Sequence, residues 1–198
     1  MEFNDIIGTF PHIAKKIFQD LTLENLEVCL KVSQTWCSYL EKEKFFWAKM
    51  TKGHPGWDEI LKLESDLVLK LGKSFLKLKN EPEQRKSDKI VIHPIFCAIH
   101  LDNLNIFTYL TSIWTNWETL RYPYVFGPKI LPFHFAAKWG SLKIIKYFVE
   151  INEDKNPKDT MNGPMAPTSM TPLHFAVMAC QLETIQFLFD NIQGRETK

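Results

Sequence analysis

A six-residue phrase recurs in the C-terminal half of this chain. It reads PFHFAA from Pro132 and PLHFAV from Pro172, and a weaker form, PIFCAI, begins at Pro94. Four residues after each proline lies an alanine, ten residues after it a leucine, and fifteen residues after it an aromatic residue. Three segments in register indicate an internal repeat, whose copies stack and bury their apolar faces against one another. Such an array favours binding over catalysis.

The copies resemble ankyrin repeats, whose typical phrase is threonine-proline-leucine-histidine-x-alanine followed by a glycine and a second helix. The third copy, beginning at Thr171, matches this phrase most closely. The second copy has Leu131 in place of the threonine but keeps the glycine as Gly140, whereas the first has His93 and Asp102 at these two positions. The resemblance implies an all-α solenoid over residues 90–198, with copies that start near residues 93, 131 and 171.

The residue types agree with a helix–turn–helix unit. Proline suits the first turn of a helix, where a backbone amide has no partner, and Thr171 can cap the helix that follows it. Gly140 permits a tight turn between two helices. His134 and His174 occupy equivalent positions, and the resemblance implies that this histidine supports the turn by hydrogen bonding rather than holding a metal.

The copies are more widely spaced than in the family. Pro94 to Pro132 is 38 residues and Pro132 to Pro172 is 40, against about 33 in the family. We expect the extra residues in the connecting segments 114–129 and 152–170. The second is rich in turn-forming residues. The first is aromatic, and its side chains can either stack on a ligand or fill the core: Trp114, Trp117, Tyr122, Tyr124 and Phe126.

Residues 1–50 have a different pattern, with apolar residues at helical spacing. This segment resembles an F-box, the helical module that docks onto the Skp-type adaptor of cullin–RING ubiquitin ligases. The opening leucine-proline of the family is replaced here by Phe10-Pro11, which lies one residue nearer to Ile17 than is usual. Ser33 occupies a position where cysteine is common in the family. The spacing that carries the resemblance runs through Ile17-Phe18, Leu21, Leu26, Val32, Trp36 and Phe46-Trp47.

The two resemblances imply two sets of contact residues. The predicted adaptor-binding residues are Phe10, Pro11, Ile13, Ile17, Leu21 and Leu26. The predicted target-binding residues lie on the concave face of the repeats and are His100, Leu101, Lys138, Trp139 and Met178. Trp139 has two readings, because a large aromatic residue at a variable position can anchor a partner or can pack on the neighbouring repeat.

Residues 51–89 connect the two modules. Apolar residues at helical spacing predict one or two helices within 57–79, which pack on the F-box or cap the first repeat. The polar segment 80–89 is predicted to be an exposed loop. The whole chain is therefore predicted to be all-α, with an F-box at 1–50, a helical linker and loop at 51–89, and ankyrin repeats at 90–198.

Composition excludes several functional classes. The net charge of +1 gives no reason to expect binding to nucleic acid or to an anionic membrane. No apolar run approaches the ~20 residues that span a bilayer, and residues 1–10 lack the pattern of a secretory signal. The scattered Cys29, Cys37, Cys97 and Cys180 are expected to be reduced. We therefore expect a cytoplasmic or nuclear protein.

Catalytic motifs are missing from the sequence. It has no cysteine–histidine set at zinc spacing, no glycine-rich phosphate loop and no nucleophile motif, so we expect no enzyme activity, cofactor or metal. The interpretation is a substrate receptor of a Skp–cullin–F-box ubiquitin ligase, which binds the Skp-type adaptor and an unidentified target protein. The alternative is an ankyrin scaffold unconnected to ubiquitination, in which the F-box-like segment is a helical cap.

Overall fold

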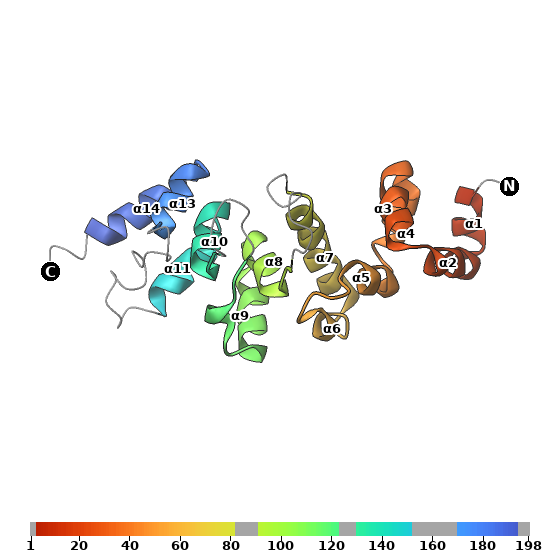
Figure 1. Ribbon diagram of the computed structural model, residues 1–198, viewed down its shortest axis with the longest axis horizontal. Coiled ribbons are helices and arrows are strands. Elements are labelled where there is room, and N and C mark those ends of the chain that lie inside the picture. The colour runs from red at the N-terminus through yellow and green to blue at the C-terminus, as the bar shows by residue number, and fades with distance from the viewer. Residues whose placement is uncertain (1–2, 82–90, 123–129, 152–169, 194–198) are drawn as a thin grey trace. The chain divides into compact units, whose positions relative to one another are not determined.

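Short α-helices make up most of this computed structural model, which describes residues 3–81, 91–122, 130–151 and 170–193 (Figure 1). Within these ranges the structure has no β-strand, which confirms the predicted all-α class. None of the helices there is both long and apolar enough to span a bilayer. Contacts divide the chain into two units, Met1–Gly72 and Lys73–Lys198, and the division falls inside one helix. The predicted domain boundaries stay a prediction.

The first unit is built from short helices joined by tight turns. Pro11 occupies the first turn of its helix, and the Thr22 side chain accepts a hydrogen bond from the Asn25 amide at 3.3 Å to cap the next one. The first helix packs against the second and the fourth, and the third packs against the fourth. The helices are α1 (Phe3–Thr9), α2 (Pro11–Asp20), α3 (Leu23–Val32), α4 (Gln34–Leu40), α5 (Lys44–Met50) and α6 (Trp57–Ile60), followed by the start of α7 (Ser65–Lys79).

Aromatic side chains form two parts of the core in this unit. Phe18 on α2 is fully buried, with its ring centroid 6.0 Å from Trp36 and 5.8 Å from Tyr39. Trp47 on α5 is buried against α7 at Gly72, where an added Cβ atom would lie only 2.5 Å from the indole ring. The absence of a side chain at Gly72 is therefore what lets these two helices approach.

The second unit contains three helix pairs, and each repeated phrase begins a helix at its proline. Within each copy the two helices pack on each other, and the first helices of successive copies stack side by side. The pairs are α8 (Pro94–His100) with α9 (Leu104–Ile113), α10 (Pro132–Trp139) with α11 (Leu142–Glu150), and α13 (Pro172–Met178) with α14 (Leu182–Gln193). The predicted helical repeats are thus confirmed for the described residues.

All three copies turn between their helices through one residue with positive φ. This residue is Gly140 in the second copy, with φ of 67°, which confirms the predicted glycine turn. Asp102 (φ 46°) and Cys180 (φ 53°) hold the same position in the other two copies. Residues with a Cβ atom are strained in this region, so the first and third turns store a small amount of backbone strain.

Two hydrogen-bonding side chains join the first copy to the second. The Asp102 carboxylate accepts hydrogen bonds from the Lys143 and Ile144 amides at 3.0 and 3.2 Å, and so caps α11 from the preceding copy. Ser141 stands at the N-cap of α11 but does not cap it, because its hydroxyl donates instead to the Ile99 carbonyl at 2.6 Å. Asp102 of the first copy and Ser141 of the second thereby each form a hydrogen bond with the backbone of the other copy.

The predicted helices between residues 57 and 79 are confirmed as α6 and α7. The N-terminal half of α7 packs on Trp47 in the first unit through Gly72. In the second unit, the Ser74 hydroxyl donates to the Cys97 carbonyl at 3.1 Å and lies 2.8 Å from His100 Nδ1. The C-terminal half of α7 therefore contacts α8 of the first copy through Ser74. The predicted loop 80–89 lies almost wholly outside the described residues.

Two aromatic residues of the segment after α9 fill the core. Trp117, in a short 3₁₀ helix (Trp117–Thr119), lies with its ring centroid 5.2 Å from Phe107 and 5.3 Å from Phe148. Tyr122 lies 4.5 Å from Phe135 and is almost fully buried. The core interpretation is confirmed for these two residues. Tyr124, Phe126 and nearly all of the second connecting segment lie outside the described residues.

Candidate interaction surfaces

Helix α2 leaves one apolar side exposed. Its periodicity places Ala14 and Phe18 in the core, whereas Phe10, Ile13 and Ile17 stay on the surface with 39%, 42% and 37% of their area exposed. We name these three residues the α2 stripe: Phe10 is the N-cap that directly precedes α2, and Ile13 and Ile17 lie four residues apart on one side of the helix. Contiguous exposed apolar residues mark interaction sites more often than isolated ones do.

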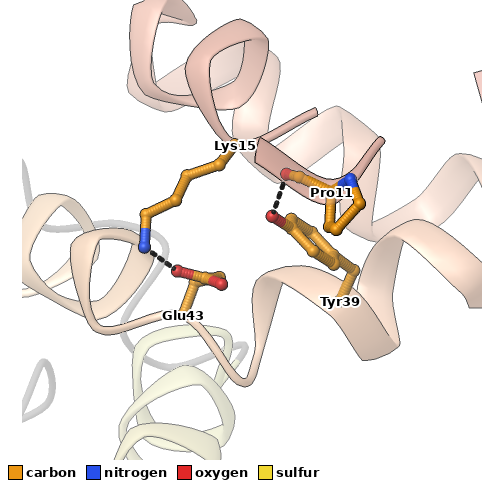
Figure 2. Close-up of polar contacts among 4 residues, drawn as sticks. All are labelled: Pro11, Lys15, Tyr39 and Glu43. Carbon is orange, nitrogen blue, oxygen red and sulfur yellow. Dashed lines mark hydrogen bonds and ion pairs between the residues drawn. The ribbon is translucent and has the colours of Figure 1, made fainter. Parts of the chain in front are cut away.

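Polar contacts on the other sides of α2 fix its orientation (Figure 2). The Tyr39 hydroxyl donates to the Pro11 carbonyl at 2.9 Å, and Lys15 Nζ lies 2.7 Å from a Glu43 carboxylate oxygen. At the end of the helix, Lys49 Nζ donates to the Leu21 carbonyl at 2.8 Å and also to the carbonyl of Gln19. These contacts hold α2 against α4 and α5 with the α2 stripe facing outward.

The electrostatics of these contacts keep the donors protonated. The hydrogen bond to Glu43, together with the attraction of its charge, raises the pKa of Lys15. Burial raises the pKa of Tyr39, so its phenol remains a donor to the Pro11 carbonyl. Both groups therefore remain protonated donors across the physiological pH range.

The six predicted adaptor-binding residues do not all reach the surface. Phe10, Pro11, Ile13 and Ile17 are exposed, and Leu21 is half-buried. Leu26 is fully buried, because α3 turns its side chain into the core. Leu26 thus supports the surface from beneath and does not line it. Adaptor binding by the exposed residues stays a prediction.

The predicted target-binding residues lie at the C-terminal ends of the three stacked helices α8, α10 and α13. We name this surface the inner-helix face; its residues are His100, Leu101, Lys138, Trp139 and Met178. Met178 is 61% exposed and Leu101 is also exposed, whereas the other three are half-buried. The structure brings these side chains onto neighbouring helices, and their contact with a target stays a prediction.

Trp139 packs on the preceding copy. Its ring centroid lies 4.5 Å from that of His100, with the two rings nearly perpendicular, and Lys138 Nζ lies 5.9 Å from its ring centroid. The indole Nε1 is buried and has no hydrogen-bond partner among the described residues. The contact with His100 is the packing on a neighbouring repeat that was one of the two predictions for Trp139. Its role as a binding anchor stays a prediction.

His100 is held neutral where α7, α8 and α10 meet. Burial, with a smaller effect of the Lys77 charge, lowers the pKa of His100 to about 4. The Nδ1 atom of the neutral His100 ring lies 2.8 Å from the Ser74 hydroxyl, and the same ring packs nearly perpendicular to the ring of Trp139. This edge of the inner-helix face is accordingly built from uncharged aromatic groups, with Lys138 beside them.

The two equivalent histidines differ in their surroundings. His174 Nδ1 accepts a hydrogen bond from the Thr171 amide at 3.1 Å, and Thr171 Oγ1 accepts one from the His174 amide at 3.5 Å. This capping box confirms the predicted role of the histidine in the third copy. In the second copy Leu131 offers no side-chain cap, and His134 is buried with its ring against Phe175. Among the described residues no three potential metal ligands cluster.

Comparison with known proteins bears on the repeats. A sequence model described as ankyrin repeats matches residues 95–197 in three copies, which is just over half of the chain. No F-box family model matches the N-terminal segment. Searches of curated proteins and of solved structures gave no match. Ankyrin repeats indicate a protein–protein interaction role, and no catalytic family is indicated.

Proposed function

The chain belongs to the ankyrin-repeat family, and we propose that it is a substrate receptor of a Skp–cullin–F-box ubiquitin ligase. In this proposal the first unit binds the Skp-type adaptor and the inner-helix face binds a target protein. The chain carries out no bond chemistry itself. It raises the effective concentration of the target near a ubiquitin-charged conjugating enzyme, because both are bound to one assembly. We place it in the cytoplasm or nucleus, where such ligases act.

The observation that supports the adaptor-binding part is the α2 stripe. Phe10, Ile13 and Ile17 coincide with the F-box positions whose apolar side chains the resemblance assigns to the adaptor. Full burial of such a side chain stabilises a complex by about 1.5–3 kcal/mol. Because about 40% of each remains exposed, the three together supply roughly 2–3 kcal/mol on docking. This corresponds to a change of about 30-fold or more in affinity.

The test is binding of a purified Skp-type adaptor by the full chain. We expect replacement of Phe10, Ile13 and Ile17 with alanine to weaken binding by about 30-fold. Val28→Ala is the matched control, since Val28 is an exposed apolar residue on the neighbouring helix α3 that the proposal does not use. Circular dichroism should be the same for all three proteins. Equal adaptor binding by the triple variant and the control would reject the α2 stripe as the docking surface.

Co-purification from cells separates this function from its alternative. A ligase receptor brings the Skp-type adaptor and a cullin with it, and the triple variant loses both. An ankyrin scaffold unconnected to ubiquitination brings a target protein alone, and its partners are the same for the triple variant and for Val28→Ala.

A further inference from the structure

A cavity of about 300 Å³ lies in the first copy, beside the N-terminal end of α8. His93 contributes one wall, and the segment that follows α9 contributes the others through Ile113, Trp114, Trp117 and Leu120. Thr115, Asn116 and Thr119 supply polar groups, and none of the described residues that line the cavity is charged at neutral pH. The cavity is at the opposite end of α8 from His100, so it is separate from the inner-helix face.

His93 presents a hydrogen-bond donor that is not used within the described part of the chain. His93 is only 8% exposed, and its Nδ1 accepts a hydrogen bond from the Ile95 amide at 3.3 Å, which caps α8. Burial lowers the pKa of His93 to about 4, so the ring is neutral at physiological pH and its proton resides on Nε2. No described residue accepts a hydrogen bond from this atom. A donor on a side chain that is itself largely buried favours a ligand that carries an acceptor oxygen.

The walls favour an aromatic group. The Trp114 ring lies with its centroid 4.6 Å from that of His93, nearly perpendicular to it, and Trp117 closes the cavity against Phe107. Its volume equals the liquid volume of about ten waters and lies at the lower end of the roughly 300–1,000 Å³ range of ligand pockets. It therefore suits a single ring better than a larger ligand, and the described lining residues carry no charge that would balance an anion.

We propose that this cavity binds a tyrosine side chain of a partner protein, with its ring against Trp114 and its hydroxyl oxygen accepting from His93 Nε2. Tyrosine combines an apolar ring with one polar atom and is enriched among the residues that anchor protein interfaces. The Asn116 and Thr115 side chains at the cavity can accept the phenolic proton. The partner is a protein because the array is a protein-binding module. The inference does not depend on the α2 stripe or on ligase function.

The probe is p-cresol, which reproduces the tyrosine side chain, compared with toluene, which lacks the hydroxyl. Saturation-transfer NMR on the full chain measures the dissociation constant of each compound. We expect p-cresol to bind at least fivefold more tightly than toluene, because only p-cresol can accept from His93. Equal affinities for the two compounds, or no binding of p-cresol, would overturn the inference.

Two variants locate the site. His93→Asn keeps a side-chain oxygen to cap α8 but removes the Nε2 donor, and we expect it to bind p-cresol about fivefold more weakly while toluene is unaffected. Trp114→Leu removes an aromatic wall at a half-buried position and should weaken both compounds. Unchanged p-cresol binding by Trp114→Leu would overturn the inference even if His93→Asn did not fold. Leu182→Ala, at an exposed position in the third copy, is the control; equal weakening there would show unspecific adsorption and would also overturn it.

Discussion

Asp102 combines a strained backbone with a cap on the next copy, and substitutions can separate the two effects. Asp102→Gly relieves the positive φ of 46° but removes the carboxylate that accepts from the Lys143 and Ile144 amides. Asp102→Ala removes the carboxylate and keeps the strain. Asp102→Asn keeps an acceptor oxygen and loses only the charge.

The size of each effect follows from these contacts. Loss of an N-cap costs about 1–2 kcal/mol, and the negative charge at the start of α11 contributes about 0.3–1 kcal/mol. Relief of the strained turn returns about 1 kcal/mol when glycine is introduced. We therefore expect destabilisation of about 0.5 kcal/mol for Asp102→Asn, about 1 kcal/mol for Asp102→Gly and about 2 kcal/mol for Asp102→Ala.

Urea unfolding followed by circular dichroism measures this order. Cys180→Gly is the matched control, because Cys180 has a φ of 53° at the equivalent position of the third copy and its side chain caps no helix among the described residues. This control should gain up to about 1 kcal/mol. If Asp102→Gly is also more stable than the original protein, strain outweighs the cap and the reasoning about Asp102 is wrong.

Three further predictions concern stability. Gly140→Ala should destabilise by at least about 1–2 kcal/mol in urea unfolding, because φ is 67° and its Cβ atom would lie 2.3 Å from the side-chain oxygen of Gln181. Gln181→Ala in the same chain should restore only the steric part, and full recovery would contradict a backbone contribution. The free energy of unfolding should fall as the pH decreases from about 6.5 to about 4, because folding lowers the pKa values of His93 and His100 to about 4 and the unfolded state therefore takes up these protons first. In His93→Asn the loss of stability over this pH range should be smaller by at most about 3 kcal/mol. The same loss in the variant and in the original protein would contradict the role of His93. Thr171→Val should cost about 1 kcal/mol through loss of the capping box, with hydrogen exchange rising first in α13; uniform exchange across the copies would contradict a local effect.

Local signals in the sequence predicted much of the second unit. The prolines predicted where α8, α10 and α13 begin, and Gly140 predicted the turn because few other residues adopt its φ without strain. The N-cap at Thr171 followed from its place before Pro172, whereas the hydrogen-bonding role of His174 was implied by the resemblance to ankyrin repeats. All of these depend on residues a few positions apart, where spacing in the chain fixes spacing in the structure.

Contacts between distant residues could not be predicted in this way. The Asp102 carboxylate meets α11 about forty residues later, and the sequence presents it only as a departure from glycine. The apolar pattern of α2 by itself likewise does not distinguish Phe18, which is buried, from Ile17, which is exposed. Only the resemblance to an F-box placed Ile17 among the contact residues. Which side of α2 is covered depends on α4 and α5, whose positions no periodicity specifies. The donor at His93 was missed for the same reason, since its surroundings come from the segment after α9.

The hydrogen bonds that Asp102 and Ser141 each make to the backbone of the other copy have a consequence for how this array can evolve. In a solenoid of equivalent modules, a copy can be duplicated or deleted because each interface resembles every other. Here Asp102 of the first copy caps helix α11 of the second copy, and Ser141 of the second copy donates a hydrogen bond to the Ile99 carbonyl of the first. Gln181 holds the place of Ser141 in the third copy and contacts Gly140 instead. Deletion of residues 131–170 would place the third copy directly after the first, and this new interface would lack the pair of hydrogen bonds made by Asp102 and Ser141. The order of the copies is therefore constrained by specific hydrogen bonds as well as by shape.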